Sequence, residues 1–189
     1  MPTLALFIFA FSLLLTGLTQ STENASPIPS KVPLTPDQIA VYRTFLERYD
    51  NGGRPLHLAN RTEAFFYPDE APCGKGLHIM TEDGAIGVVH RLDPSLAIPG
   101  RVALVDPDEK PVAGKANDAH KTRGEGKTSD EAVGLLTLSE IAFDKNHHFA
   151  AMAFSYWCGI LCGHGGIVIF EKTGGRWKMT EKICGEWVS

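Results

Sequence analysis

The last third of the chain constrains the fold most, because it contains four apolar runs in succession. The runs are Leu136–Phe143, Phe149–Cys158, Ile167–Lys172 and Trp177–Trp187. A polar D-K-N-H-H stretch separates the first two runs, and a T-G-G-R stretch separates the last two. Short runs of this kind, joined by turn residues, are typical of β-hairpins. We therefore predict a C-terminal meander of four antiparallel strands.

An amphipathic helix is predicted ahead of these strands. Thr35 is a capping residue, Pro36 occupies the first helical position and Gln38 the third. The apolar residues that follow at helical spacing are Ile39, Tyr42, Phe45, Leu46 and Tyr49. The segment 50–53, Asp-Asn-Gly-Gly, then ends the helix. A helix followed by sequential strands predicts an α+β fold, with this helix packed on one face of a mainly antiparallel β-sheet.

The middle of the chain is less regular. Leu56–Ala59, Ala85–Leu92 and Arg101–Val105 are expected to be short strands, and residues 62–84 to be irregular. Residues 106–131 are hydrophilic and lack periodicity, which indicates an exposed loop. The length from residue 35 to residue 189 suits a single domain with one core.

The first residues have the pattern of an export signal. An apolar run from Leu4 to Leu15 is followed by a small, polar stretch, although no Lys or Arg precedes Lys31. A membrane-spanning helix needs about 20 apolar residues, so the run is too short for a permanent anchor. We expect a signal peptide at residues 1–20 and a flexible Pro/Ser-rich tether at residues 21–34. The mature protein is then secreted or periplasmic, with no integral membrane span after leader removal.

The charge pattern limits the partners. The net charge is −4, acids and bases are interspersed, and there is no basic stripe, so nucleic acid is not expected as a partner. No G-x-S-x-G, P-loop or H-E-x-x-H motif occurs, and we expect no cofactor. The partner is unknown from sequence; an envelope protein is the kind of partner that export suggests.

Four cysteines in an exported chain favour two disulfides, for which three pairings exist. We favour Cys158–Cys162 together with Cys73–Cys184. In an extended strand Cys158 and Cys162 would lie about 13 Å apart, whereas a disulfide needs about 4.4 to 6.8 Å between Cα atoms. The chain must therefore turn between them, and Gly159 allows such a turn. A five-residue loop contributes about 2 kcal/mol and a loop of about 112 residues nearer 5 kcal/mol.

The segment C-G-I-L-C-G-H-G permits three interpretations. Cys158, Cys162 and His164 could hold copper or zinc, and the segment superficially resembles the copper-binding loop of cytochrome oxidase subunit II. Gly166 and Ile169 stand where that family has its histidine and methionine, so its ligands are not carried over. Thiol–disulfide exchange is the second interpretation, although the spacing is C-x-x-x-C rather than C-x-x-C. We favour the third, in which the cysteines are structural and His164 is an exposed loop residue. No catalytic, cofactor-binding or metal residue is assigned.

Other polar residues are weaker candidates. His147 and His148 fall in a predicted hairpin turn, where solvated side chains are expected. Glu140 lies in an alternating L-T-L-S-E-I-A-F run, so we predict a surface residue rather than a general base. The acidic stretch 106–109 lacks the ligand spacing of an EF-hand loop.

The pattern S-E-I-A-F-D…C-G-I-L-C-G-H-G…F-E-K…W…C-G-E-W-V-S over residues 135–189 is similar to that of uncharacterised short secreted proteins from soil-type bacteria. The resemblance implies a bacterial, exported, single-domain protein and supplies no activity. Our leading hypothesis is a non-enzymatic envelope-associated or extracellular binding module. The alternative is a metal-binding or thiol-redox protein that uses the Cys158/Cys162/His164 turn.

Overall fold

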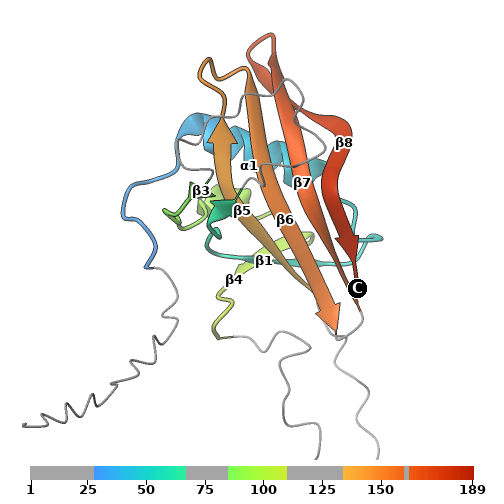
Figure 1. Cartoon of the computed structure of the whole chain (residues 1–189). Helices are drawn as coiled ribbons and strands as arrows, with labels where there is room; N and C mark the ends of the chain where they lie inside the picture. The colour runs from blue at the N-terminus through green and yellow to red at the C-terminus, as the bar shows by residue number, and fades with distance from the viewer. Residues whose placement is uncertain (1–27, 67–84, 110–133, 160–161) are drawn as a thin grey trace, which may run out of the picture.

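The structure is a computed structural model, and it describes residues 28–66, 85–109, 134–159 and 162–189. These residues form a six-stranded mixed sheet, one α-helix, a short 3₁₀ helix and a two-stranded ribbon (Figure 1). The helices are α1 (Pro36–Arg48) and η1 (Pro94–Leu96). The strands are β1 (Leu56–Ala59), β2 (Phe65–Phe66), β3 (Ala85–Ile86), β4 (Val102–Val105), β5 (Leu135–Phe143), β6 (Phe149–Gly159), β7 (Cys162–Thr173) and β8 (Arg176–Val188). The predicted α+β class is confirmed.

Strands β5 to β8 form the antiparallel meander that the sequence predicts, and Figure 1 shows them as four long neighbouring ribbons. The turn between β7 and β8 contains Gly174 (φ 59°) and Gly175 (φ 77°). Positive φ at both central residues is the requirement of the tight turn that fits the twist of a hairpin. The Gly-Gly pair therefore fixes the register of the last two strands.

The other side of the sheet is parallel, which the sequence did not predict. The sheet order is β4-β1-β5-β6-β7-β8, and β1 pairs in parallel with both β4 and β5. The strand predicted over Ala85–Leu92 is wrong for most of its length, since only Ala85–Ile86 is extended in a ladder. Farther along that segment, His90 and Arg91 form isolated bridges to Ser30 and Arg61.

Helix α1 begins as predicted, with a reciprocal capping box between Thr35 and Gln38. Its buried residues are Val41, Tyr42, Phe45 and Leu46. They join the main core together with residues of the sheet such as Leu138, Met152 and Phe170. The helix therefore covers one face of the sheet, and the other face carries a separate, smaller apolar cluster of Phe65, Ala142, Ala151, Ile167, Ile169 and Cys184.

The ends of α1 are tied to distant parts of the chain. Near its start, the Asp37 carboxylate accepts hydrogen bonds from Lys172 Nζ (2.9 Å) and from Trp177 Nε1 (3.1 Å). Near its end, the Arg101 guanidinium donates to the Leu46 carbonyl at 2.5 Å. The Lys172 ammonium holds the pKa of Asp37 below its usual value. A negative charge therefore lies at the N-terminal end of α1 and a positive charge at its C-terminal end, which is the arrangement that the helix dipole favours.

The segments at the margins of the domain correct one expectation. Ser30 N donates to the Val89 carbonyl at 2.7 Å, and Leu34 is buried in the core, so the last residues of the predicted 21–34 tether are docked. Of the predicted 106–131 loop, residues 106–109 form a turn closed by the Asp106 side chain. Residues 1–27, which include the expected signal peptide, and residues 110–131 lie outside the described residues.

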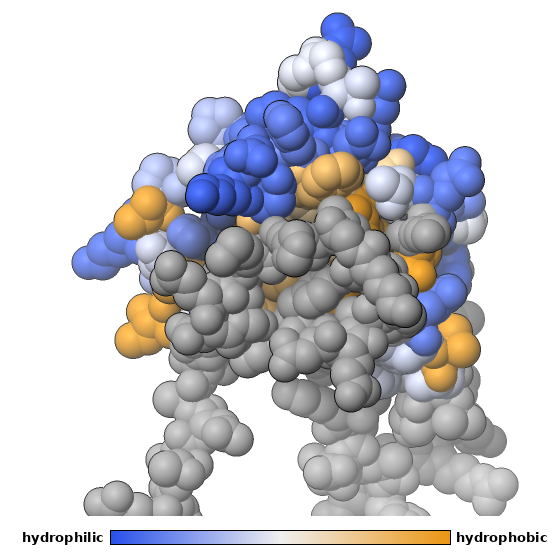
Figure 2. Space-filling model, turned by 45° about the horizontal axis from the view of Figure 1, so that its top comes forward, coloured by the Kyte–Doolittle hydropathy of each residue, from blue (hydrophilic) through white to orange (hydrophobic). Residues whose placement is uncertain are grey.

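The described surface above the sheet is mainly polar. Figure 2 shows hydrophilic side chains gathered over the end of the molecule where the β-hairpin tips lie, with smaller hydrophobic areas apart from one another below them. In the part of the chain that the structure describes, no helix combines the length and the apolar composition needed to cross a membrane.

Candidate functional site

A β-bulge in β5 interrupts the regular alternation of side chains. The register between β5 and β6 shifts between Leu138 and Ile141. The segment after β1 forms backbone hydrogen bonds with β5 at this bulge. Glu63 N donates to the Leu138 carbonyl (2.9 Å), and Glu140 N donates to the Glu63 carbonyl (2.7 Å). Bulges redirect side chains and are frequent beside binding and catalytic sites.

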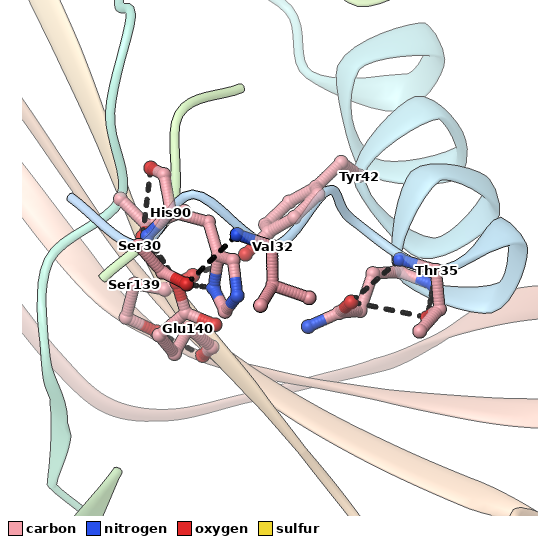
Figure 3. Close-up of polar contacts among 9 residues, drawn as sticks. Ser30, Val32, Thr35, Tyr42, His90, Ser139 and Glu140 are labelled. Atoms are coloured by element: carbon pink, nitrogen blue, oxygen red, sulfur yellow. Dashed lines mark hydrogen bonds and ion pairs between the residues drawn. The ribbon is translucent and has the colours of Figure 1, made fainter. Parts of the chain in front are cut away.

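Glu140 is only 1% exposed, so the prediction of a surface residue is wrong. A carboxylate is buried when hydrogen-bond donors surround it, and such donors come here from segments far away in sequence. One carboxylate oxygen, Oε1, accepts from the Thr62 hydroxyl, from His90 N (3.0 Å) and from His90 Nδ1 (2.9 Å) (Figure 3). The carboxylate therefore joins β5 to two segments far away in sequence.

Two further hydroxyl groups complete the cluster around Glu140. Tyr42 donates to the Ser139 carbonyl at 2.9 Å, and burial, with the Glu140 charge as a smaller cause, raises the pKa of Tyr42. Ser139 Oγ donates to the Glu140 carbonyl (2.7 Å) and accepts from Ala153 N (2.8 Å). A carboxylate that orients a histidine also occurs in catalytic sites. Here Thr62 and Tyr42 are 2% and 0% exposed, so their hydroxyls are out of reach of a substrate.

A groove lies on the face of the sheet opposite α1, and its volume is about 320 Å³. Its lining residues come from β5, β6, β7, β8 and the chain after β1: Glu63, Ala64, Thr137, Ser139, Ala153, Phe154, Ser155, Gly166, Ile167, Gly185 and Trp187. The size is at the small end of the range for ligand sites, and the lining combines apolar surface with a few polar groups, as ligand sites do.

The hydroxyl groups in the floor of the groove are hydrogen-bonded within the protein. Thr137 Oγ1 and Ser155 Oγ lie 2.6 Å apart, and Thr137 Oγ1 also reaches the Ser155 carbonyl at 3.5 Å. When Ser155 donates to Thr137 and Thr137 donates to that carbonyl, both protons are used. The proton of Ser139 is used on the Glu140 carbonyl. The floor then presents oxygen lone pairs, because a hydroxyl has one proton and two acceptor positions.

Trp187 forms one wall of the groove and lies directly over Gly165. A Cβ atom at Gly165 would stand 2.6 Å from Trp187 Nε1 and 2.5 Å from the Phe154 carbonyl oxygen. The Trp187 ring also contacts that of Trp157, with ring centroids 5.2 Å apart. Glycine in a strand often marks such a close approach. Residues 163–166 thus belong to β7, rather than to the loop that the sequence suggested, and they make room for indole rings.

Glu63 supplies the carboxylate of the groove. Partial desolvation by surrounding groups raises the pKa of the Glu63 carboxyl, and the nearby Arg61 charge opposes this rise. The residue as a whole still has enough contact with solvent to count as exposed. Arg61 is itself held by both oxygens of the Asp108 carboxylate, at 2.6 and 2.7 Å. Among the described residues, no side chain forms a hydrogen bond or ion pair with the Glu63 carboxylate.

The residues of the predicted metal or redox turn are arranged differently. Cys158 and Cys162 form a disulfide with their Cα atoms 5.1 Å apart. His164 is a half-buried strand residue rather than an exposed loop residue, and its Nε2 lies 3.0 Å from the Tyr49 hydroxyl, whose pKa burial raises. In the described ranges no group of three or more His, Cys, Asp or Glu side chains is placed to hold a metal ion.

The other histidine candidates lie in the β5–β6 turn, as predicted. The His147 ring stacks on Phe143 with centroids 4.8 Å apart, and its Nδ1 lies 3.8 Å from an Asp37 oxygen. Its side chain remains 58% exposed. This arrangement is that of a packed surface residue.

The second predicted disulfide is Cys73–Cys184. Cys184 is disulfide-bonded and 2% exposed, whereas Cys73 lies outside the described residues, so the pairing remains a prediction.

Thiol labelling of the denatured, unreduced protein tests this pairing. We expect no labelled cysteine, because the pairing uses all four. Mass mapping of the peptides should join Cys73 to Cys184. Two labelled thiols, or a peptide joining Cys73 to Cys158, would contradict the pairing.

Comparisons with known proteins identify no relative: no protein-family model, curated protein or solved structure matches the chain. The site must therefore be interpreted from its own geometry.

Proposed function

We propose that this protein is an exported, non-enzymatic binding module that holds a small ligand in the groove on the helix-free face of the sheet. The observation that carries the proposal is the groove itself. It brings a carboxylate, an indole ring and three hydroxyl-bearing side chains from separate parts of the chain to one hollow. Such convergence of polar groups on a concave, partly apolar surface is characteristic of ligand sites.

The state of the polar groups favours binding over catalysis. General acid–base or nucleophilic chemistry needs a base within hydrogen-bond reach of a group that it activates. The Glu140 carboxylate has such a group in the Thr62 hydroxyl, but the two residues are only 1% and 2% exposed, so a substrate does not reach them. The groove hydroxyls are bonded to one another or to backbone.

Export is supported by two independent features. The residues before Ser21 have the length and composition of a signal peptide. The Cys158–Cys162 disulfide suits an oxidising compartment outside the cytoplasm. We propose a periplasmic or extracellular location, where an envelope component would be the natural source of a ligand or partner.

Chemical-shift mapping tests the groove as the binding site. The isotope-labelled mature protein is titrated with n-butylammonium, 1-butanol, butanoate and glucose in separate experiments. We expect at least one compound to shift the Trp187 indole and Ser155 amide signals, and all four compounds to remain chemically unchanged. Shifts confined to the hollow beside β4, which Ile98 and Val102 line, or no shifts at all, would refute the proposal.

A further inference from the structure

We infer that the groove selects ligands that carry a protonated primary amine. This inference rests on the proposed function and specifies its ligand. It follows from three properties of the lining: its charge, its hydrogen-bonding capacity and its aromatic wall.

The charge of the groove is negative. Among the described residues that line it, Glu63 is the single ionisable one, and none of them is Lys, Arg or His. The nearest guanidinium in sequence, that of Arg61, is engaged with Asp108 through two hydrogen bonds. A carboxylate without a protein partner binds a cation through a charge-assisted hydrogen bond, and it repels an anion.

The hydrogen-bonding capacity of the floor requires a donor. The Ser139 proton is used on the Glu140 carbonyl and one proton is used between Thr137 and Ser155, while the oxygens of Thr137 and Ser155 keep acceptor positions. An ammonium group has three donors and no acceptor, so it complements such a floor. A carboxylate ligand has only acceptors and would meet oxygen lone pairs.

The aromatic wall suits the same group. Trp187 is held in place by contact with Gly165 below it and Trp157 beside it. The face of a tryptophan ring attracts cations, and its hydrocarbon surface also accommodates the methylene groups next to an amine. Trp187 therefore serves both parts of an alkylammonium ligand.

A comparison of matched four-carbon compounds tests this inference. Titrations of n-butylammonium, 1-butanol and butanoate are followed by the Trp187 indole signal, and binding of such small compounds is expected in about the millimolar range. We expect butylammonium to bind about tenfold more tightly than 1-butanol, and butanoate to bind least. In Glu63→Gln this preference should disappear, while 1-butanol binding stays the same. Glu109→Gln, at an exposed acid away from the groove, is the matched control and should behave like the native protein.

Each outcome of this comparison has a definite meaning. If 1-butanol or butanoate binds as tightly as butylammonium, or if Glu63→Gln keeps the preference, the amine inference is wrong while the groove remains a binding site. If none of the three compounds shifts the Trp187 signal, the inference is overturned, and the proposed function is overturned with it when glucose leaves that signal unmoved as well. Dispersed spectra of both glutamine variants show that the fold is intact in each case.

Discussion

Replacement of Glu140 by alanine is expected to lower the free energy of unfolding by about 3–5 kcal/mol, the range for breaking a buried charged network. The Glu140 carboxylate is the acceptor for Thr62 Oγ1, His90 N and His90 Nδ1. Without it, the half-buried His90 donors lose their shared acceptor and a cavity remains next to the bulge. Urea denaturation of the variant and the native protein measures the difference.

Two control variants separate the role of this network from the general effect of losing a glutamate. Glu140→Gln keeps one acceptor oxygen and should cost less, about 1–2 kcal/mol. Glu109→Ala removes an exposed carboxylate and should change stability by less than about 0.5 kcal/mol. If Glu140→Ala were as mild as Glu109→Ala, Glu140 would not be the centre of a buried network.

Substitution of Gly165 by alanine is expected to cost about 1–3 kcal/mol, the usual cost of overpacking. The added Cβ would collide with the Phe154 carbonyl oxygen, which cannot move without disturbing the β6–β7 ladder, and with the Trp187 ring. Because the ring must shift, butylammonium binding should weaken together with stability. Thermal unfolding and the Trp187 indole shift report the two effects.

Gly87→Ala is the matched control, since no atom lies within 4 Å of the position where its Cβ would be. It should leave both stability and binding close to those of the native protein. A Gly165→Ala protein with native stability and an unmoved Trp187 signal would show that the indole does not rest on Gly165.

The sequence was most informative where local signals and the hydrophobic period agreed. The capping box at Thr35, the turn at Gly174-Gly175 and the apolar runs of the meander each specify short-range structure, and the structure contains all of them. The parallel pairing of β1 with β4 and β5 joins segments far apart in the chain. Strands of four residues carry no local signal for such partners.

The candidate site was the part least predictable from sequence. Strict alternation would put Glu140 on the same buried face as Leu136 and Leu138, but a carboxylate is rarely buried, so its residue type suggested the surface. Its partners Thr62 and His90 lie 78 and 50 residues away. The one available signal was a lone glutamate followed by Ile141 and Ala142 in an apolar strand.

The glycines within residues 163–166 are a second feature whose structure the sequence did not predict. Their abundance suggested a turn, because glycine is common where the chain reverses direction. In the structure they form the start of β7, and two of them lie beneath Trp157 and Trp187. Trp157 precedes Gly163 on the neighbouring strand and Trp187 follows Gly165 by more than twenty residues, and spacing alone does not assign either ring to its glycine.

Ligand binding on the helix-free face of the sheet is the property on which both proposals depend. Intermolecular nuclear Overhauser effects from the methylene protons of bound n-butylammonium test it most directly. We predict cross-peaks to the Trp187 ring and to the Ile167 methyl groups, both of which line the groove. Cross-peaks to Ile98 or Val102, beside β4, would place the compound in a different hollow and contradict the account.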